Sequence, residues 1–216
     1  MTDDGNGLSS HRRQPVRVER VVTSGIFSLD GDDFEVDNNI WLVGDDDTVV
    51  IIDAAHQAGP IADAVGDRRV ELIICTHGHN DHINAAAELA DRVDAPIAIH
   101  PADAELWAAV YPDRAPDREL ADGEVVAGMT VLHTPGHSPG GVSLHLAELA
   151  TVFSGDTLFN GGPGATGRSF SDRPTLLRSI EARLLPLPDD TVVHTGHGDS
   201  TTIGAERAIW PETGAP

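Results

Sequence analysis

The stretch CTHGHNDHINAAAELADRV, residues 75–93, places three histidines and one aspartate within six positions. It follows an apolar run and precedes a segment with helical periodicity. His77 and His79 stand two apart at the end of the expected strand, so both can reach one point, whereas Asp81 and His82 begin the next element and point elsewhere. Neutral imidazole and carboxylate are ligands that Zn²⁺ and similar metals take. The segment therefore predicts two neighbouring metal ions, because a polar turn with incidental histidines would leave this crowding unexplained.

Three further ligand-type residues stand in similar places along the chain. His137 lies in a Gly/Pro turn after an expected strand at 129–133, Asp156 follows a strand at 150–154, and His197 follows a strand at 190–194. Strand ends converge on one edge of a sheet, which is where an α/β fold usually gathers its site. We expect these three residues to complete the metal centre.

The order of strands and helices along the chain predicts an α/β layered fold. Apolar residues that share a face repeat every two positions in a strand and about every 3.6 positions in a helix, which distinguishes the two kinds of element. Strands are predicted at 16–22, 38–44, 48–55, 70–77, 95–100, 124–133, 141–147, 150–154 and 190–194. Helices are predicted at 58–66, 82–93, 101–110, 172–185 and from about 202. Two similar halves that mix strands and helices indicate two mixed sheets flanked by helices.

Length and charge restrict the partners. The 216 residues fit one domain, which we place at 16–216 after a disordered polar tail at 1–15. A net charge of −21, with 14 arginines and no lysine, argues against nucleic acid and anionic membranes as partners. The acidic runs at 30–37 and 44–48 are interpreted as solvated turns. A single cysteine, Cys75, excludes an internal disulfide, and we expect a cytoplasmic protein.

Four segments together resemble the successive motifs of the metallo-β-lactamase-fold hydrolases, and within them the glyoxalase II-like branch. These segments are THGHNDH (76–82), TPGHSPGG (134–141), FSGDTLF (153–159) and TGHGD (195–199), and the likeness runs from about residue 20 to residue 205. The resemblance implies an αββα sandwich. It also implies that His77, His79 and His137 hold one metal, that Asp81, His82 and His197 hold the second, and that Asp156 bridges the two. Asp53 would orient the ligands.

Differences from other branches of the superfamily at two ligand positions narrow the expected activity and metal. Members that destroy penicillins with a cysteine ligand would carry cysteine near position 156, where this chain has Asp156. Oxygen-reducing di-iron members carry glutamate where this chain has His79, which favours two Zn²⁺ ions, with iron or manganese as alternatives. The segments DNNIWLVG, FNGGPGATGRSFSD and HTGHGDSTTIGAE are similar to small bacterial hydrolases that use mycothiol. The second segment contains a Gly-rich stretch at 160–168 that we expect to line the pocket. In it we expect Asn160 and Arg168 to contact substrate, with a surface or intramolecular ion pair as the alternative for Arg168.

The predicted chemistry is hydrolysis of a small-molecule thioester. Two metals about 3.5 to 4 Å apart can share a hydroxide at neutral pH and polarise a carbonyl group, and Asp81 would orient that hydroxide. A thiolate, with a parent pKa near 8.5, leaves without a proton donor. The likeness to the mycothiol-using hydrolases implies an S-acyl or S-formyl mycothiol as the substrate. A lactonase or other ester hydrolase, a persulfide dioxygenase with one iron, and a metal-loaded binding protein remain alternatives, and the oligomeric state stays open.

Overall fold

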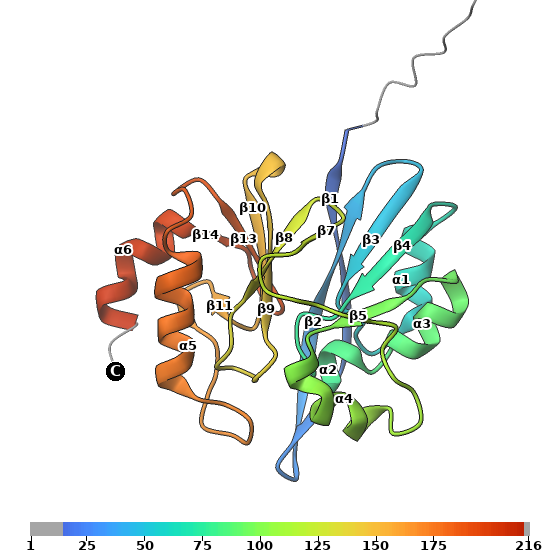
Figure 1. Ribbon diagram of the computed structural model, residues 1–216, viewed down its shortest axis with the longest axis horizontal. Coiled ribbons are helices and arrows are strands. Elements are labelled where there is room, and N and C mark those ends of the chain that lie inside the picture. The colour runs from blue at the N-terminus through green and yellow to red at the C-terminus, as the bar shows by residue number, and fades with distance from the viewer. Residues whose placement is uncertain (1–14, 214–216) are drawn as a thin grey trace, which may run out of the picture.

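The computed structural model describes residues 15–213 and has two six-stranded sheets packed face to face (Figure 1). The first sheet has the order β1-β2-β3-β4-β5-β6, formed by Arg17–Leu29, Asp32–Gly44, Thr48–Ile52, Arg69–Ile74, Ile97–Ile99 and Arg118–Glu119. The second has the order β14-β13-β10-β9-β8-β7, formed by Thr201–Thr202, Val192–Thr195, Thr151–Gly155, Val142–Leu146, Met129–His133 and Val125–Val126. Both sheets mix parallel and antiparallel pairs.

Helices cover the outer face of each sheet. On the first sheet these are α1 (Ala58–Val65), α3 (Ala86–Val93) and α4 (Ala104–Val110), with the short α2 (Asn80–Ile83) at one end (Figure 1). On the second sheet they are α5 (Arg173–Ser179), which continues as a π-helical turn at Ile180–Leu184, and α6 (Ile203–Thr213). A small ribbon of β11 (Leu158–Phe159) and β12 (Gly162–Pro163) lies between the second sheet and α6. Short 3₁₀ turns occupy Pro101–Asp103 and Ala147–Leu149.

Alternating side chains explain this layering. On β3, Val49 and Ile51 pack with the helices of the first sheet, whereas Val50 and Ile52 pack between the two sheets. Phe153 of the second sheet joins the same inter-sheet core. A third core lies between the second sheet and its helices. The expected αββα sandwich of two mixed sheets flanked by helices is confirmed.

Several segments differ from the sequence-based expectation, and the strand expected at 124–133 is a hairpin of β7 and β8. The acidic run at 30–37 is not a turn throughout, because β2 begins at Asp32 and pairs with β1 as far out as Leu29. Its side chains are mostly exposed, so an apolar alternation that would reveal a strand is missing. The helix expected at 82–93 is divided between α2 and α3, since the amide of Ala85 bonds the carbonyl of Ala54.

The structure also bears on what was expected of Cys75 and of the N-terminal segment. Cys75 is fully buried in the core between the first sheet and its helices, and burial raises its pKa well above the usual value, as suits an inert core residue. Residues 1–14 of the expected polar tail lie outside the described residues. No helix within 15–213 is long and apolar enough to span a bilayer.

Candidate metal centre

All seven ligand-type residues come together at one end of the sandwich, where strands of both sheets finish. His77 and His79 lie in the loop after β4, and Asp81 and His82 lie on α2, which starts directly behind that loop. The second sheet contributes the other three, each just after a strand. These are His137 after β8, Asp156 after β10 and His197 after β13.

The first ligand group consists of three ring nitrogens. Nδ1 of His79 lies 3.0 Å from Nε2 of His77 and 2.9 Å from Nε2 of His137. Nδ1 of His137 faces the carbonyl of Ala165 at 2.8 Å, and because a carbonyl only accepts, Nε2 of the neutral ring presents a lone pair to the centre. Burial lowers the pKa of His79 to about 3 and that of His77 well below its usual value. The rings of His77 and His79 are therefore neutral at physiological pH, which is the ligand form.

The second group combines a carboxylate with two imidazoles. Oδ2 of Asp81 lies 3.2 Å from Nε2 of His197 and 3.5 Å from Nε2 of His82. Nδ1 of His197 donates to the carbonyl of Asp37 at 2.7 Å, which fixes the ring. Burial opposes protonation of His197, but Asp156 and Asp81 outweigh it and raise its pKa to about 10. Burial likewise opposes ionisation of Asp81, but His82 and His197 hold its pKa at about 2. A divalent cation would replace the protons of such a cluster.

Asp156 lies between the two groups. Its carboxylate oxygens are 3.4 Å from Nε2 of His82, 3.5 Å from that of His197 and 3.6 Å from that of His137. Buried Oδ1 has no well-formed hydrogen bond among the described residues. An unpaired buried carboxylate oxygen costs free energy unless a cation or donor satisfies it. The residues present therefore fit a pair of divalent metal ions that share Asp156.

Asp53 lies where the sequence places it. Its Oδ2 faces Nδ1 of His82 at 2.9 Å, and its two oxygens accept bonds from the amide and hydroxyl of Thr76. This anchored carboxylate keeps the proton on Nδ1 of His82 and leaves Nε2 for the centre.

Sequence reasoning missed Asn38 and His56. Nδ2 of buried Asn38 lies 3.1 to 3.4 Å from Asp81, His82 and His197, while its Oδ1 lies 2.8 Å from Nε2 of His56. An amide at the middle of a strand carries no metal-site signature, and His56 stands outside the histidine motifs. Neither residue could be singled out from the pattern.

Gly196, next to His197, is a point of close approach. A Cβ built there would lie 2.2 Å from Oδ1 of Asp156 and 2.7 Å from Cε1 of His82. Both contacts are far inside van der Waals distance, so the position has room only for hydrogen.

The two expected substrate residues are not brought to the ligands. Arg168 pairs with Asp32 at 3.0 Å, and its guanidinium carbon lies 4.7 Å over the ring of Phe34, so it holds the tip of the β1–β2 hairpin. Asn160 is exposed in the turn between β11 and β12. Its neighbour Phe159 lies nearer the centre, with its ring 6.3 Å from that of His197.

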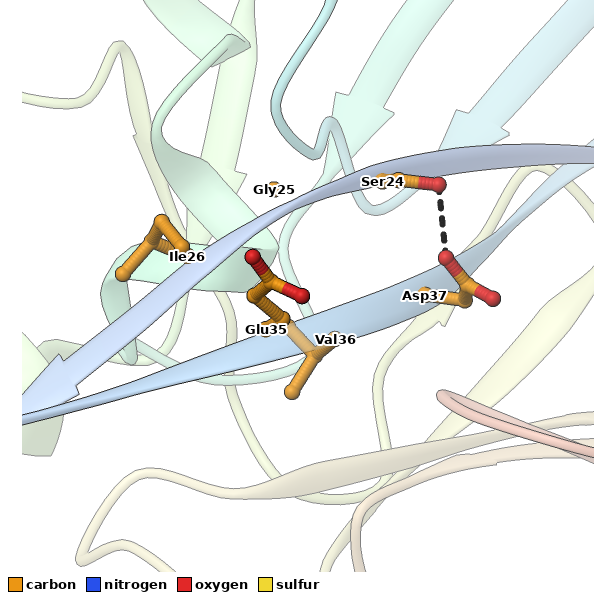
Figure 2. Close-up of a pocket in the computed structure, with 6 residues that line it drawn as sticks. All are labelled: Ser24, Gly25, Ile26, Glu35, Val36 and Asp37. Atoms are coloured by element: carbon orange, nitrogen blue, oxygen red, sulfur yellow. Dashed lines mark hydrogen bonds between the residues drawn. The ribbon is translucent and has the colours of Figure 1, made fainter.

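A cavity of about 560 Å³ opens along the β1–β2 hairpin. Figure 2 shows the residues that line it, contributed by both strands: Ser24, Gly25, Ile26, Glu35, Val36 and Asp37. The hydroxyl of Ser24 donates to the carboxylate of Asp37 (Figure 2). Asp37 contributes its side chain to this cavity and its carbonyl to Nδ1 of His197, and the carboxylates of Glu35 and Asp37 make the cavity acidic.

Comparison with known proteins agrees with this geometry. A family model described as the metallo-beta-lactamase superfamily matches residues 34–197. The chain belongs to the metallo-beta-lactamase superfamily. It is 34% identical to the Haemophilus influenzae hydroxyacylglutathione hydrolase GloC, covering 80% of this chain and 91% of that protein. It is also 34% identical to the probable metallo-hydrolase YqgX of Bacillus subtilis, covering 78% and 89%.

Solved structures of the superfamily are similarly close. TTHA1623 in a di-iron-bound form superposes with a TM-score of 0.74 at 35% identity, covering 80% of this chain and 93% of that one. The B3 metallo-beta-lactamase BLEG-1 gives 0.72 at 29% identity, covering 86% and 97%. The chain is thus a metallo-hydrolase of this superfamily with a glyoxalase II-like branch among its relatives, as its motifs led us to expect.

Proposed function

We propose that this metallo-hydrolase cleaves thioesters of a small thiol with two divalent ions bound at its His/Asp centre. The observation that carries the proposal is Asp156, which stands within 3.6 Å of histidines from both ligand groups. Zinc is the expected metal from the donor set, and the di-iron form of TTHA1623 makes iron the alternative to test.

The roles of the side chains follow from their positions. His77, His79 and His137 would hold one ion, and Asp81, His82 and His197 the other. When bound, such ions supply Lewis acidity and lower the pKa of water. Oδ2 of Asp81 is the acceptor that would orient the attacking water.

The side-chain amide of Asn38 also lies close to the centre. Its Nδ2 donates to Oδ2 of Asp81 at 3.1 Å. A thiolate leaving group needs no protonation near neutral pH, so these residues suffice for a thioester. An amine leaving group would need an acid in addition.

Charge around the centre favours an uncharged thiol carrier. Glu35 and Asp37 line the cavity along the β1–β2 hairpin, and Asp32 already neutralises Arg168, the cation expected from the sequence to meet substrate. An anionic carrier such as glutathione would meet like charges there. This supports an S-acyl or S-formyl mycothiol.

A substrate panel tests the proposal. The purified protein, assayed for metal content, is given matched S-acyl esters of mycothiol and glutathione, a lactone, a β-lactam and a persulfide. We expect about two ions per chain and the highest kcat/KM for the mycothiol ester. Thioesters left intact while the lactone or β-lactam is cleaved would assign another hydrolase class. Sulfite formed by protein with one iron per chain would assign a persulfide dioxygenase.

A further inference from the structure

Asp103 is a fully buried carboxylate that the reaction outlined above does not use. It ends the 3₁₀ turn Pro101–Asp103, between β5 and α4. Its Oδ2 accepts bonds of 2.7 Å from the amide of Gly78 and from the hydroxyl of Ser138, and its Oδ1 accepts one of 2.5 Å from the amide of Gly140. All three donors are neutral groups.

These donors belong to the two segments that carry the first ligand group. Gly78 lies between His77 and His79, and Ser138 and Gly140 follow His137 in its loop. One carboxylate therefore ties a loop of the first sheet to a loop of the second.

The packing around Asp103 is tight on both sides. A Cβ at Gly140 would lie 2.7 Å from Cγ of Asp103, and one at Gly78 would lie 3.0 Å from its Cβ. Neither glycine position has room for a side chain, and the hydrogen bonds oppose a shift of either loop away from Asp103.

The second ligand group has separate supports. Asp53 holds His82, the carbonyl of Asp37 holds His197, and Asn38 contacts Asp81. Asp103 bonds none of these. An ionised Asp103 would also add negative charge near the first ligand group, which favours a cation there.

From this arrangement we infer that Asp103 is the positioning residue of the His77/His79/His137 metal site and sets the affinity of that site alone. The inference goes beyond the proposed reaction because it concerns which of two sites holds its metal, whatever the substrate.

The test measures the metal affinity of each site in isolation. A His197→Ala background leaves the first site, and a His79→Ala background leaves the second. Asp103→Asn is placed in both, and Zn²⁺ affinity is measured on the full chain by competition with a chromophoric chelator. The side-chain NH₂ of an asparagine would face at least one of the backbone amides of Gly78 and Gly140. At least one hydrogen bond between position 103 and these loops would then be lost. We expect affinity to fall about 10- to 100-fold in the first background and less than about threefold in the second.

Two further variants separate positioning from general destabilisation. Glu206→Gln neutralises another buried carboxylate that accepts bonds from a backbone amide and a hydroxyl, those of Gly161 and Thr201, away from the first group. It should not lower first-site affinity selectively. Ser138→Ala removes one of the three bonds and should lower first-site affinity several-fold even if Asp103→Asn does not fold.

Equal losses in both backgrounds, or no loss in either, would overturn the inference. If Asp103→Asn does not fold, an unchanged first-site affinity in Ser138→Ala would overturn it as well. A parent protein that binds no metal would instead contradict the proposed function, so the two failures are distinguishable.

Discussion

At the scale of single residues, the partners behind each ligand decide how the centre works. Nδ1 of His82, His137 and His197 each faces an acceptor, a carboxylate in the first case and a carbonyl in the other two. These contacts select one tautomer and aim Nε2 at the ion site. Among the residues that the structure describes, Asp156 is the carboxylate whose oxygens lie within 3.6 Å of histidines from both ligand groups, so its charge matters most.

Asp156→Asn should therefore be severe. The change keeps the shape but removes the charge that balances two cations, so metal content should fall below two ions per chain and kcat should drop by about 100-fold or more. Elemental analysis and steady-state kinetics check this. His145→Gln on β9 is the matched control, since His145 is half-buried away from the ligands and should leave both values within several-fold. Near-parental hydrolysis by Asp156→Asn with one bound ion would argue against a shared carboxylate.

At the scale of elements, the β1–β2 hairpin reaches across to the second half of the chain. Arg168 pairs with Asp32, and the amide of Ser169 bonds the carboxylate of Asp30 at 3.0 Å. Phe27 on the same hairpin lies with its ring 5.3 Å from that of His79. The hairpin thus connects the 160–172 loop with the first ligand group.

Arg168→Ala tests what this connection does. The ion pair is largely exposed, so its loss should lower the free energy of unfolding by less than about 1 kcal/mol. Since Arg168 is engaged by Asp32, kcat and KM should stay within several-fold of the parent. A KM raised tenfold or more with kcat unchanged would show instead that Arg168 binds substrate. Denaturant melts and kinetics on Arg168→Ala and Asp32→Asn together decide between the two outcomes.

His194 on β13 links elements of both sheets and should make stability depend on pH. Its ring lies 4.2 Å from that of Trp41 and 5.2 Å from that of Phe153, and burial lowers its pKa from 6.5 to about 4. Between these two values the unfolded chain binds more protons than the folded one, so the stability from the neutral ring is complete above pH 6.5 and is lost as pH falls toward 4.

Comparison with His194→Gln isolates this effect. Because the ring is partly exposed, we expect the pH-dependent difference between parent and variant to be on the order of 1 to 2 kcal/mol. Urea melts at several pH values from 4 to 7 measure it. Parallel stability curves for the two proteins would contradict the assignment.

At the scale of the whole molecule, the centre joins the two halves of the sandwich. Residues 77–82 come from the first sheet and its loops, and His137, Asp156 and His197 come from the second. Bound ions should therefore stabilise the complete fold. Two ions, each at about 100 times its Kd, should together raise Tm by on the order of 10 to 20 °C over chelated protein. Calorimetry with and without chelator measures this, and His79→Ala should show a smaller difference; equal Tm values in the parent would exclude a stabilising centre.

The sequence was most informative where chemistry and strand ends coincide. His77, His79, Asp81 and His82 stand out because ligand-type side chains rarely crowd after an apolar strand. Buried strands such as β3 are recognisable as short continuous apolar runs. Asn38 and Asp103 were missed because their roles depend on contacts between residues distant in the chain. The outer half of the β1–β2 hairpin was missed because both of its faces are largely exposed. Arg168 was placed near substrate on a Gly-rich pattern that holds no information about Asp32.

Gly196 has a consequence for how this protein can change over generations. Because a side chain at that position would intrude on Asp156 and His82, selection should reject every replacement there as firmly as it rejects loss of a ligand. A saturation scan scored by survival or turnover should rank position 196 with the histidines, although glycine contributes no functional group. Gly161, where a built Cβ meets nothing within 4 Å, has a positive φ of 99° and should tolerate asparagine better than Gly196 does. A position can thus reject every substitution simply because no space is available for a side chain there.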